Sequence, residues 1–296
     1  MHGFSFEYID IGAVRLRLAS AGDPKRPLIL CLHGFPEYWA GWKQVMEELS
    51  GEFYLVAPDQ RGYNLSSRPQ EVEAYRTREL VADIAALADR LSPDRPFILA
   101  GHDWGASVAY AYAFRHPERL SHLVIANGVH PVCFQRAILE DPAQRKASQY
   151  INLLRSRHAE EILAADGFRR LMGMIGKFSK TEFMDEETRS GYLEAWTKEG
   201  ALTGMLNWYR AAPIVVPGPG ELAAMPELMV GGNFEVRMPH LLLWGEADEA
   251  LLPSTIMGLG EHVPDLAITR FADAGHWILH EKPREVATAM KQFLLG

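Results

Sequence analysis

The segment AGHDWGAS, residues 100–107, decides how the chain is read. A short apolar run, PFILA, precedes it, and SVAYAYAFRH with helical spacing follows it, so the segment predicts a strand-to-helix turn. Such a sharp turn requires small residues two positions before and after its apex, and Gly101 and Gly105 meet this requirement. Asp103 is the apex. We therefore expect its carboxylate to stand at the end of a strand.

Outward from this turn, further short apolar runs end in turn residues. Their hydrophobicity is continuous rather than alternating, which is typical of strands buried on both faces of a parallel sheet. Helix-like stretches such as YWAGWKQVMEELS and TRELVADIAALADRL separate the early runs, so the fold class is α/β, with a mostly parallel central sheet flanked by helices. The runs are LILCLHG, YLVAPDQRG, FILAGHDWG, HLVIANG, HLLLWGEAD and AITRFADAGH.

The rhythm changes in the middle of the chain. Between residues 131 and 233 the sequence is helical in pattern and contains no predicted strand, and strand pattern resumes at Met238. We interpret residues 131–233 as a helical cap inserted into a core domain made of residues 1–130 and 234–296.

Composition restricts the partners of the protein. The 296 residues include 30 basic and 38 acidic side chains, a formal charge of -8, which argues against nucleic acid or an anionic membrane as partner. The first residues resemble no signal peptide, so we expect a cytoplasmic protein. Cys31 and Cys133 fit neither a disulfide framework nor a metal motif, and we expect packed thiols, no metal and no cofactor.

An ionised aspartate at the apex has a chemical use. The positive end of the following helix favours a carboxylate there, and a carboxylate is a competent nucleophile toward a strained or polarised carbon. The alternative is that Asp103 only caps the helix. A cap does not require the glycines on either side, so the sequence favours the nucleophile.

Four motifs resemble one superfamily. HGFPE at 33–37, DQRGYN at 59–64, GHDWGAS at 101–107 and AGHW at 274–277 are similar to those of the α/β-hydrolase superfamily, and within it to the epoxide hydrolases. The superfamily order of nucleophile, acid and histidine implies Asp103, Asp248 and His276. Glu246 and Glu249 are alternatives for the acid.

The resemblance also implies a reaction. Asp103 would open an epoxide to form an ester, and His276, oriented by Asp248, would activate the water that releases a vicinal diol. Opening the ring needs proton donors, and the resemblance assigns them to Tyr150 and Tyr209 in the cap, whereas Trp208 and Tyr192 are expected in the core. It assigns the oxyanion hole to the backbone N–H groups of Phe35 and Trp104, and His33 is expected to be structural.

Other functions remain open at this point. Haloalkane and haloacid dehalogenases use the same aspartate, and a non-catalytic protein could bind a small ligand on this scaffold. The side chain of Phe35 cannot donate a hydrogen bond to a halide, as haloalkane dehalogenases require. Trp104 stands where fluoroacetate dehalogenases have an arginine. The expected partners are a small apolar epoxide and water, in a monomer or homodimer. The residues expected to line an apolar pocket are Trp39, Met172, Met174, Ile175 and Phe178.

Overall fold

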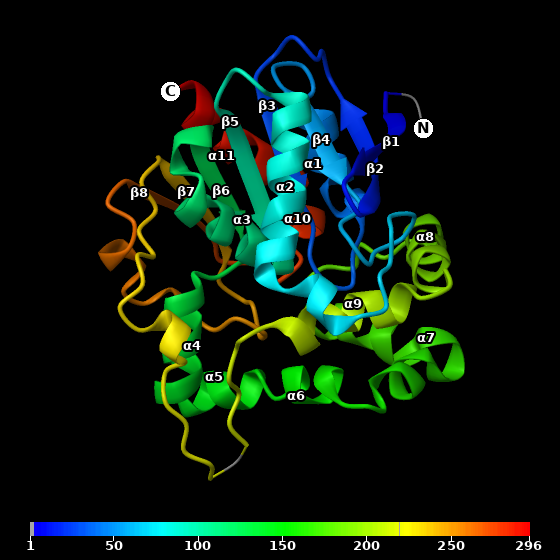
Figure 1. Cartoon of the computed structure of the whole chain (residues 1–296), viewed down its shortest axis with the longest axis vertical. Helices are drawn as coiled ribbons and strands as arrows, with labels where there is room; N and C mark the ends of the chain where they lie inside the picture. Colours follow the sequence, from blue (N-terminus) through cyan, green and yellow to red (C-terminus); the bar gives the residue numbers. More distant parts are fainter. Residues whose placement is uncertain (1–2, 219) are drawn as a thin grey trace.

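The computed structural model describes residues 3–218 and 220–296, and its centre is one eight-stranded sheet (Figure 1). The order across the sheet is β1-β2-β4-β3-β5-β6-β7-β8. The bounds of the strands are β1 Ser5–Ile11, β2 Val14–Ala21, β3 Leu28–Leu32, β4 Tyr54–Pro58, β5 Phe97–His102, β6 Leu120–Ala126, β7 His240–Gly245 and β8 Leu266–Phe271.

The sheet is mostly parallel, as the sequence predicts. Strands β3 to β8 run parallel to one another. Strand β2 pairs antiparallel with both β1 and β4. Every residue of β3, β5 and β7 is buried, which explains their unbroken apolar runs. The hairpin of β1 and β2 turns at Gly12, whose φ of 67° suits glycine.

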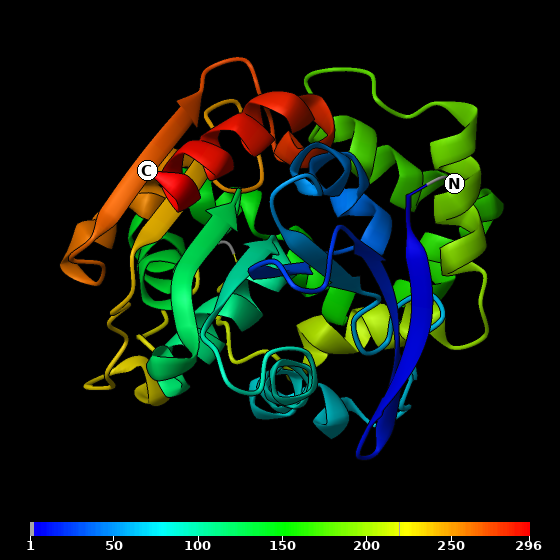
Figure 2. The ribbon, with the colours of Figure 1, turned by 90° about the horizontal axis from the view of Figure 1, so that it is seen from above.

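Helices cover both faces of this sheet. Alternate residues of β3 enter different apolar clusters, Leu30 and Leu32 with α2 and α3, and Ile29 and Cys31 with α1 and α11. In Figure 2, α11 (red) lies on one side of the sheet and α2 (cyan) on the other. The bounds are α1 Lys43–Leu49, α2 Thr77–Leu91, α3 Trp104–Arg115, α10 Ile278–Glu281 and α11 Pro283–Leu295.

Six helices lie between β6 and β7 in the chain. In Figure 1, α4, α5, α6, α7 and α9 lie below the sheet, and α8 lies at the right, above α7. Residues Ala165 to Phe168 leave helical geometry and interrupt α7. The bounds are α4 Pro131–Glu140, α5 Pro142–Ala147, α6 Tyr150–Arg155, α7 Ala159–Lys177, α8 Glu186–Trp196 and α9 Ala201–Ala211.

Short 3₁₀ turns complete the chain. They are η1 Trp39–Trp42, η2 Val72–Tyr75, η3 Pro117–Arg119, η4 Glu227–Met229, η5 Pro253–Ile256 and η6 Leu259–Glu261. None of the helices in the described ranges combines the length and the apolar character needed to cross a bilayer. The carboxyl ends of β3, β5 and β7 meet at one edge of the sheet, where open α/β sheets place their sites.

Candidate active site

The turn between β5 and α3 holds Asp103 in an unusual backbone conformation. Its φ is 50° and its ψ is −118°, a backbone region that residues other than glycine rarely adopt. A Cβ atom on Gly101 would lie 2.6 Å from the carbonyl oxygen of Gly105, and one on Gly105 would lie 2.2 Å from that of Leu32. The glycines therefore allow the turn, and the turn directs the Asp103 carboxylate away from the sheet.

One backbone N–H group donates to this carboxylate. The N–H of Phe35 donates to Asp103 Oδ1 at 2.7 Å, and the Phe35–Pro36 peptide bond is cis. Trp104 is the first residue of α3, so its N–H has no acceptor within the helix. In the same loop the buried His33 ring accepts from Gln60 N–H and donates to the Gly34 carbonyl, a structural role.

His276 lies between two carboxylates. Its Nδ1 is 2.7 Å from Asp248 Oδ2, and its Nε2 is 3.6 Å from Asp103 Oδ2. Asp248 is buried and also accepts from the N–H groups of Ala250 and Leu251. Both alternative acids are exposed at the surface, where Glu246 contacts Arg270 and Glu249 contacts Lys180.

These contacts shift the pKa values of His276 and Asp248. Burial lowers the pKa of His276, but the charges of Asp248 and Asp103 outweigh burial and raise it to about 10. Burial raises the pKa of Asp248, and the adjacent His276 with the hydrogen-bond donors around the carboxylate more than reverses this, so the pKa is lowered. Both shifts favour the charged forms of His276 and Asp248.

The two tyrosines expected in the helical segment lie above Asp103. Tyr209 of α9 is buried, and its ring packs edge-on against Phe35 and Trp104, each with centroids 5.0 Å apart. The ring of Tyr150, at the start of α6, lies 6.3 Å from that of Tyr209. Burial, together with the negative charge of Asp103, raises the pKa of both phenols, so both stay protonated at neutral pH.

Two adjoining cavities surround this group. The smaller, about 30 Å³, is lined by Asp103, Tyr150 and Tyr209 and has room for about one water molecule. The larger, about 440 Å³, is mostly apolar. The residues that line both are Trp104, Ser107, Val129, Phe134 and Ile214.

The residues expected to line the pocket lie elsewhere or at its margin. Trp39 packs against Phe4 and Phe6 in the cluster beside α1. Its indole ring belongs to the apolar cluster on the face of the sheet that α1 and α11 cover. The ring of Phe178 lies 6.3 Å from His276 and 6.2 Å from Tyr150. Met172 and Ile175 line a separate depression, and Met174 is half-buried among the apolar residues around it.

Asn127 is a site residue that the sequence did not reveal. Its Nδ2 donates to Asp248 Oδ2 at 2.8 Å, and its Oδ1 accepts from the N–H of Gly245 at 2.8 Å. Asn127 follows β6 and Asp248 follows β7, so the contact depends on these strands being neighbours. Its φ of 31° after a strand is the local signal, and sequence alone does not give it.

A second polar group lies behind the site. Glu37 is buried and accepts from His102, from His280 and, at 3.0 Å, from the hydroxyl of Tyr192. His102 Nε2 donates to the carbonyl of His276 at 2.9 Å, so this group fixes the loop that carries His276. Tyr192 and Trp208 are buried in the core, as predicted.

One cluster of potential metal ligands occurs within the described ranges, at His130, Cys133 and His262. The two imidazoles are stacked at 4.4 Å and 13°, so their lone pairs run parallel instead of converging on one point. Arg136 Nη2 lies 3.9 Å from the Cys133 sulfur and adds a positive charge. The three side chains therefore pack against one another instead of converging on an ion. Cys133, like Cys31, is a buried free thiol, as predicted.

Comparison with known families gives a match over most of the chain. A family model described as alpha/beta hydrolase fold matches residues 27–283. The chain is 34% identical over 296 residues to the AB hydrolase superfamily protein YfhM of Bacillus subtilis, with 99% of each chain covered. It is 30% identical to epoxide hydrolase 3 of Xenopus tropicalis, covering 95% of this chain and 75% of that protein.

Solved structures agree in fold. One described as a novel epoxide hydrolase of the alpha/beta hydrolase superfamily, from metagenomes of hot environments, has a TM-score of 0.88 at 36% identity, with 98% of each chain covered. The Bacillus megaterium epoxide hydrolase, solved with an inhibitor, has a TM-score of 0.88 at 31% identity, covering 98% of this chain and all of that one, 100%.

Proposed function

Since the chain belongs to the alpha/beta hydrolase family and is a hydrolase, we propose that it converts epoxides to vicinal diols through an ester on Asp103. The relatives named epoxide hydrolase support the reaction class. The observation that carries the proposal is local. An aspartate, not a serine, occupies the turn between β5 and α3, with His276 3.6 Å from its carboxylate and two protonated phenols above it.

The first step forms the ester. An Asp103 oxygen bonds to an epoxide carbon, the carbon–oxygen bond of the ring breaks, and the ring oxygen takes a proton from Tyr150 or Tyr209. Both phenols have raised pKa values, so the donor is protonated before the reaction begins. Their place in the wall of the small cavity puts them on the side from which a substrate meets Asp103.

The second step hydrolyses the ester. A water molecule hydrogen-bonded to His276 attacks the ester carbonyl carbon, and His276 takes a proton from this water. The N–H of Phe35 stabilises the negative charge that forms on the carbonyl oxygen. The diol leaves as its oxygen is protonated. Between the two steps His276 passes its proton to the tyrosinate that ring opening leaves, and the proton released when the Asp103 carboxylate forms again returns to His276, so one epoxide and one water give one diol.

Charge decides when His276 acts as a base. With both carboxylates ionised, the His276 pKa of about 10 keeps the ring protonated and unable to accept a proton. Forming the ester removes the charge of Asp103 and with it one of the interactions that raise this pKa. The imidazolium can then pass its proton to the tyrosinate that the first step leaves, and the neutral ring accepts a proton from water in the second step.

Turnover of styrene oxide by matched variants tests the proposal. We expect diol from the wild type, loss of about a thousandfold or more in Asp103→Ala, and a loss of about a hundredfold in Tyr209→Phe. Glu249→Gln, at an exposed carboxylate one residue from Asp248, is the control and keeps wild-type activity. Bromide release from a bromoalkane without any diol from styrene oxide would reject the proposal in favour of dehalogenation.

A further inference from the structure

The larger cavity extends away from Asp103 along helix α3. It shares Trp104, Ser107 and Ile214 with the small cavity at Asp103, so the two cavities adjoin. What occupies it bears on the substrate, and the inference below rests on the proposed function. At about 440 Å³ it is large enough for a chain of apolar groups that a small epoxide would leave unfilled.

One stripe of α3 forms the floor of this cavity. Trp104, Ser107, Val108, Ala111 and Arg115 all line it, and their spacing of three or four residues places them on one face of the helix. The opposite walls come from α2, from the segment after α9 and from the loop before β7. They are mostly apolar and include Leu80, Met229 and Phe234, and Phe134 of α4 and Phe114 of α3 complete the lining.

Arg115, in the last turn of α3, is the charged residue of this lining. Its neighbour Arg119 pairs with Asp89 at 2.6 Å, whereas no carboxylate in residues 3–218 and 220–296 comes within 4.0 Å of Arg115. Arg115 is exposed, and because side chains on a helix lean toward its N-terminus, its guanidinium can reach back over the end of the cavity that it lines. The end of the cavity remote from Asp103 therefore offers an uncompensated cation.

We propose that Arg115 is a carboxylate-binding residue, and that the substrate is an epoxide at one end of an unbranched apolar chain with a carboxylate at the other. The epoxide lies at Asp103 and the chain lies along α3. At about 1.5 Å per residue the twelve steps from Asp103 to Arg115 span about 18 Å. The backward lean of Arg115 shortens this, and with C–C bonds of about 1.5 Å the span fits roughly ten to twelve carbons.

The test compares a carboxylic acid with its neutral ester. We would measure kcat/KM at low ionic strength for the terminal epoxide of dodecanoic acid and for its methyl ester. We expect the wild type to favour the acid by about tenfold, since hydrogen bonds to charged groups are among the strong ones. In Arg115→Gln the acid-to-ester ratio should fall to about one.

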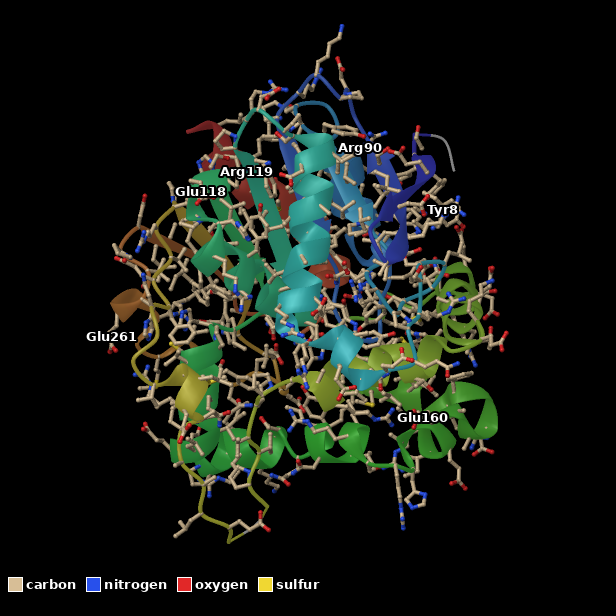
Figure 3. The ribbon with its side chains drawn as sticks, viewed as in Figure 1. Tyr8, Arg90, Glu118, Arg119, Glu160 and Glu261 are labelled. Carbon is tan, nitrogen blue, oxygen red and sulfur yellow. The ribbon has the colours of Figure 1, made fainter. Side chains whose placement is uncertain are left out.

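Arg90→Gln is the matched control. Arg90 is exposed near the end of α2, and Figure 3 shows it at the upper end of that helix, remote from α4 to α9. This variant loses the same charge without touching the cavity, so it should keep the tenfold ratio. A ratio that falls equally in Arg90→Gln would mean that net charge alone attracts the acid, and would overturn the proposal.

A second variant tests the path of the chain. Ala111→Phe places a ring in the middle of the α3 stripe, so the preference for the dodecanoic acid epoxide over the hexanoic acid epoxide should disappear. An unchanged preference would overturn the proposal. If styrene oxide is hydrolysed but the wild type treats acid and ester alike, this inference alone fails. If no epoxide is hydrolysed, the proposed function fails with it.

Discussion

Asp103 combines backbone strain with a specific set of neighbours. Its positive φ costs about 1–3 kcal/mol, which the surrounding fold must offset. In return, the carboxylate receives the Phe35 N–H and stands 3.6 Å from His276. An aspartate that only capped α3 would use its side chain on the helix N–H groups, and Asp103 makes no such cap. Its position therefore favours chemistry over helix stability.

Replacing His276 should separate the two steps. We expect His276→Gln to open epoxides but not to hydrolyse the ester, because glutamine cannot take a proton from water. Intact-protein mass spectrometry after incubation with excess styrene oxide should show one added substrate mass on most molecules. His158→Gln, at an exposed histidine, is the control and should show none. An unmodified His276→Gln protein would contradict the two-step scheme.

Part of this site is readable from single residues. The glycines around Asp103, and the chain order of Asp103, Asp248 and His276, are enough for the sequence to predict the three residues that we propose as nucleophile, acid and base. Asn127 is different because its bond to Asp248 exists only through the pairing of β6 with β7. Trp39, predicted as a pocket residue, packs in the cluster beside α1, and sequence does not say which face of the sheet a side chain meets.

At the scale of elements, the junction of β5 and α3 depends on close contact with β3. A Cβ atom on Gly105 would come within 2.2 Å of the Leu32 carbonyl oxygen. We expect Gly105→Ala to lower the free energy of unfolding by about 1–3 kcal/mol, because the backbone must shift to admit the methyl group. The same shift moves Asp103, so diol formation should fall as well.

Gly173→Ala is the matched control for this junction. Gly173 is exposed in α7, and an added Cβ would meet nothing within 4 Å. Alanine is the better helix former, so we expect this variant to raise the free energy of unfolding by about 0.5–1 kcal/mol. Urea unfolding of both variants measures the difference. Equal effects of the two substitutions would contradict the account of the junction.

The elements themselves are predictable to different degrees. The continuous runs of β3, β5 and β7 are diagnostic because both faces of those strands are covered. The apolar runs of the sequence do not predict the β1–β2 hairpin, although Gly12 marks its turn. The residues of β1 are exposed or half-buried, and β2 alternates only over its first residues, so neither strand gives the continuous apolar run of a strand buried on both faces. Where α7 is interrupted, at Ala165 to Phe168, helical periodicity alone predicts an unbroken helix.

At the scale of the whole molecule, buried neutral histidines should make the fold sensitive to acid. Burial lowers the pKa of His33 to about 4 and of His130 and His240 to about 3. As pH falls, the unfolded chain binds protons at these imidazoles near pH 6.5, which is a higher pH than the folded protein requires for the same protonation. Their contribution to stability is therefore present above pH 6.5 and is lost as pH falls through the folded pKa values.

The size of this effect can be bounded. Each of the three groups can remove up to about 1.4 kcal/mol of unfolding free energy per pH unit below 6.5. His276 has a raised pKa, so its stabilisation is complete below pH 6.5 and is lost only as pH rises toward about 10. Urea unfolding at pH 7 and pH 5 should show a clear loss in the wild type and a smaller loss in His240→Gln. Identical unfolding free energies at the two pH values would contradict this account.

The ester on Asp103 is the central claim, and one measurement tests it most directly. In a single turnover with enzyme in excess over styrene oxide in oxygen-18 water, the water oxygen enters the Asp103 carboxylate and the diol takes its new oxygen from Asp103. Mass spectrometry should therefore find an unlabelled diol and a labelled peptide containing Asp103. A labelled diol with an unlabelled peptide would show direct attack by water and would contradict the account.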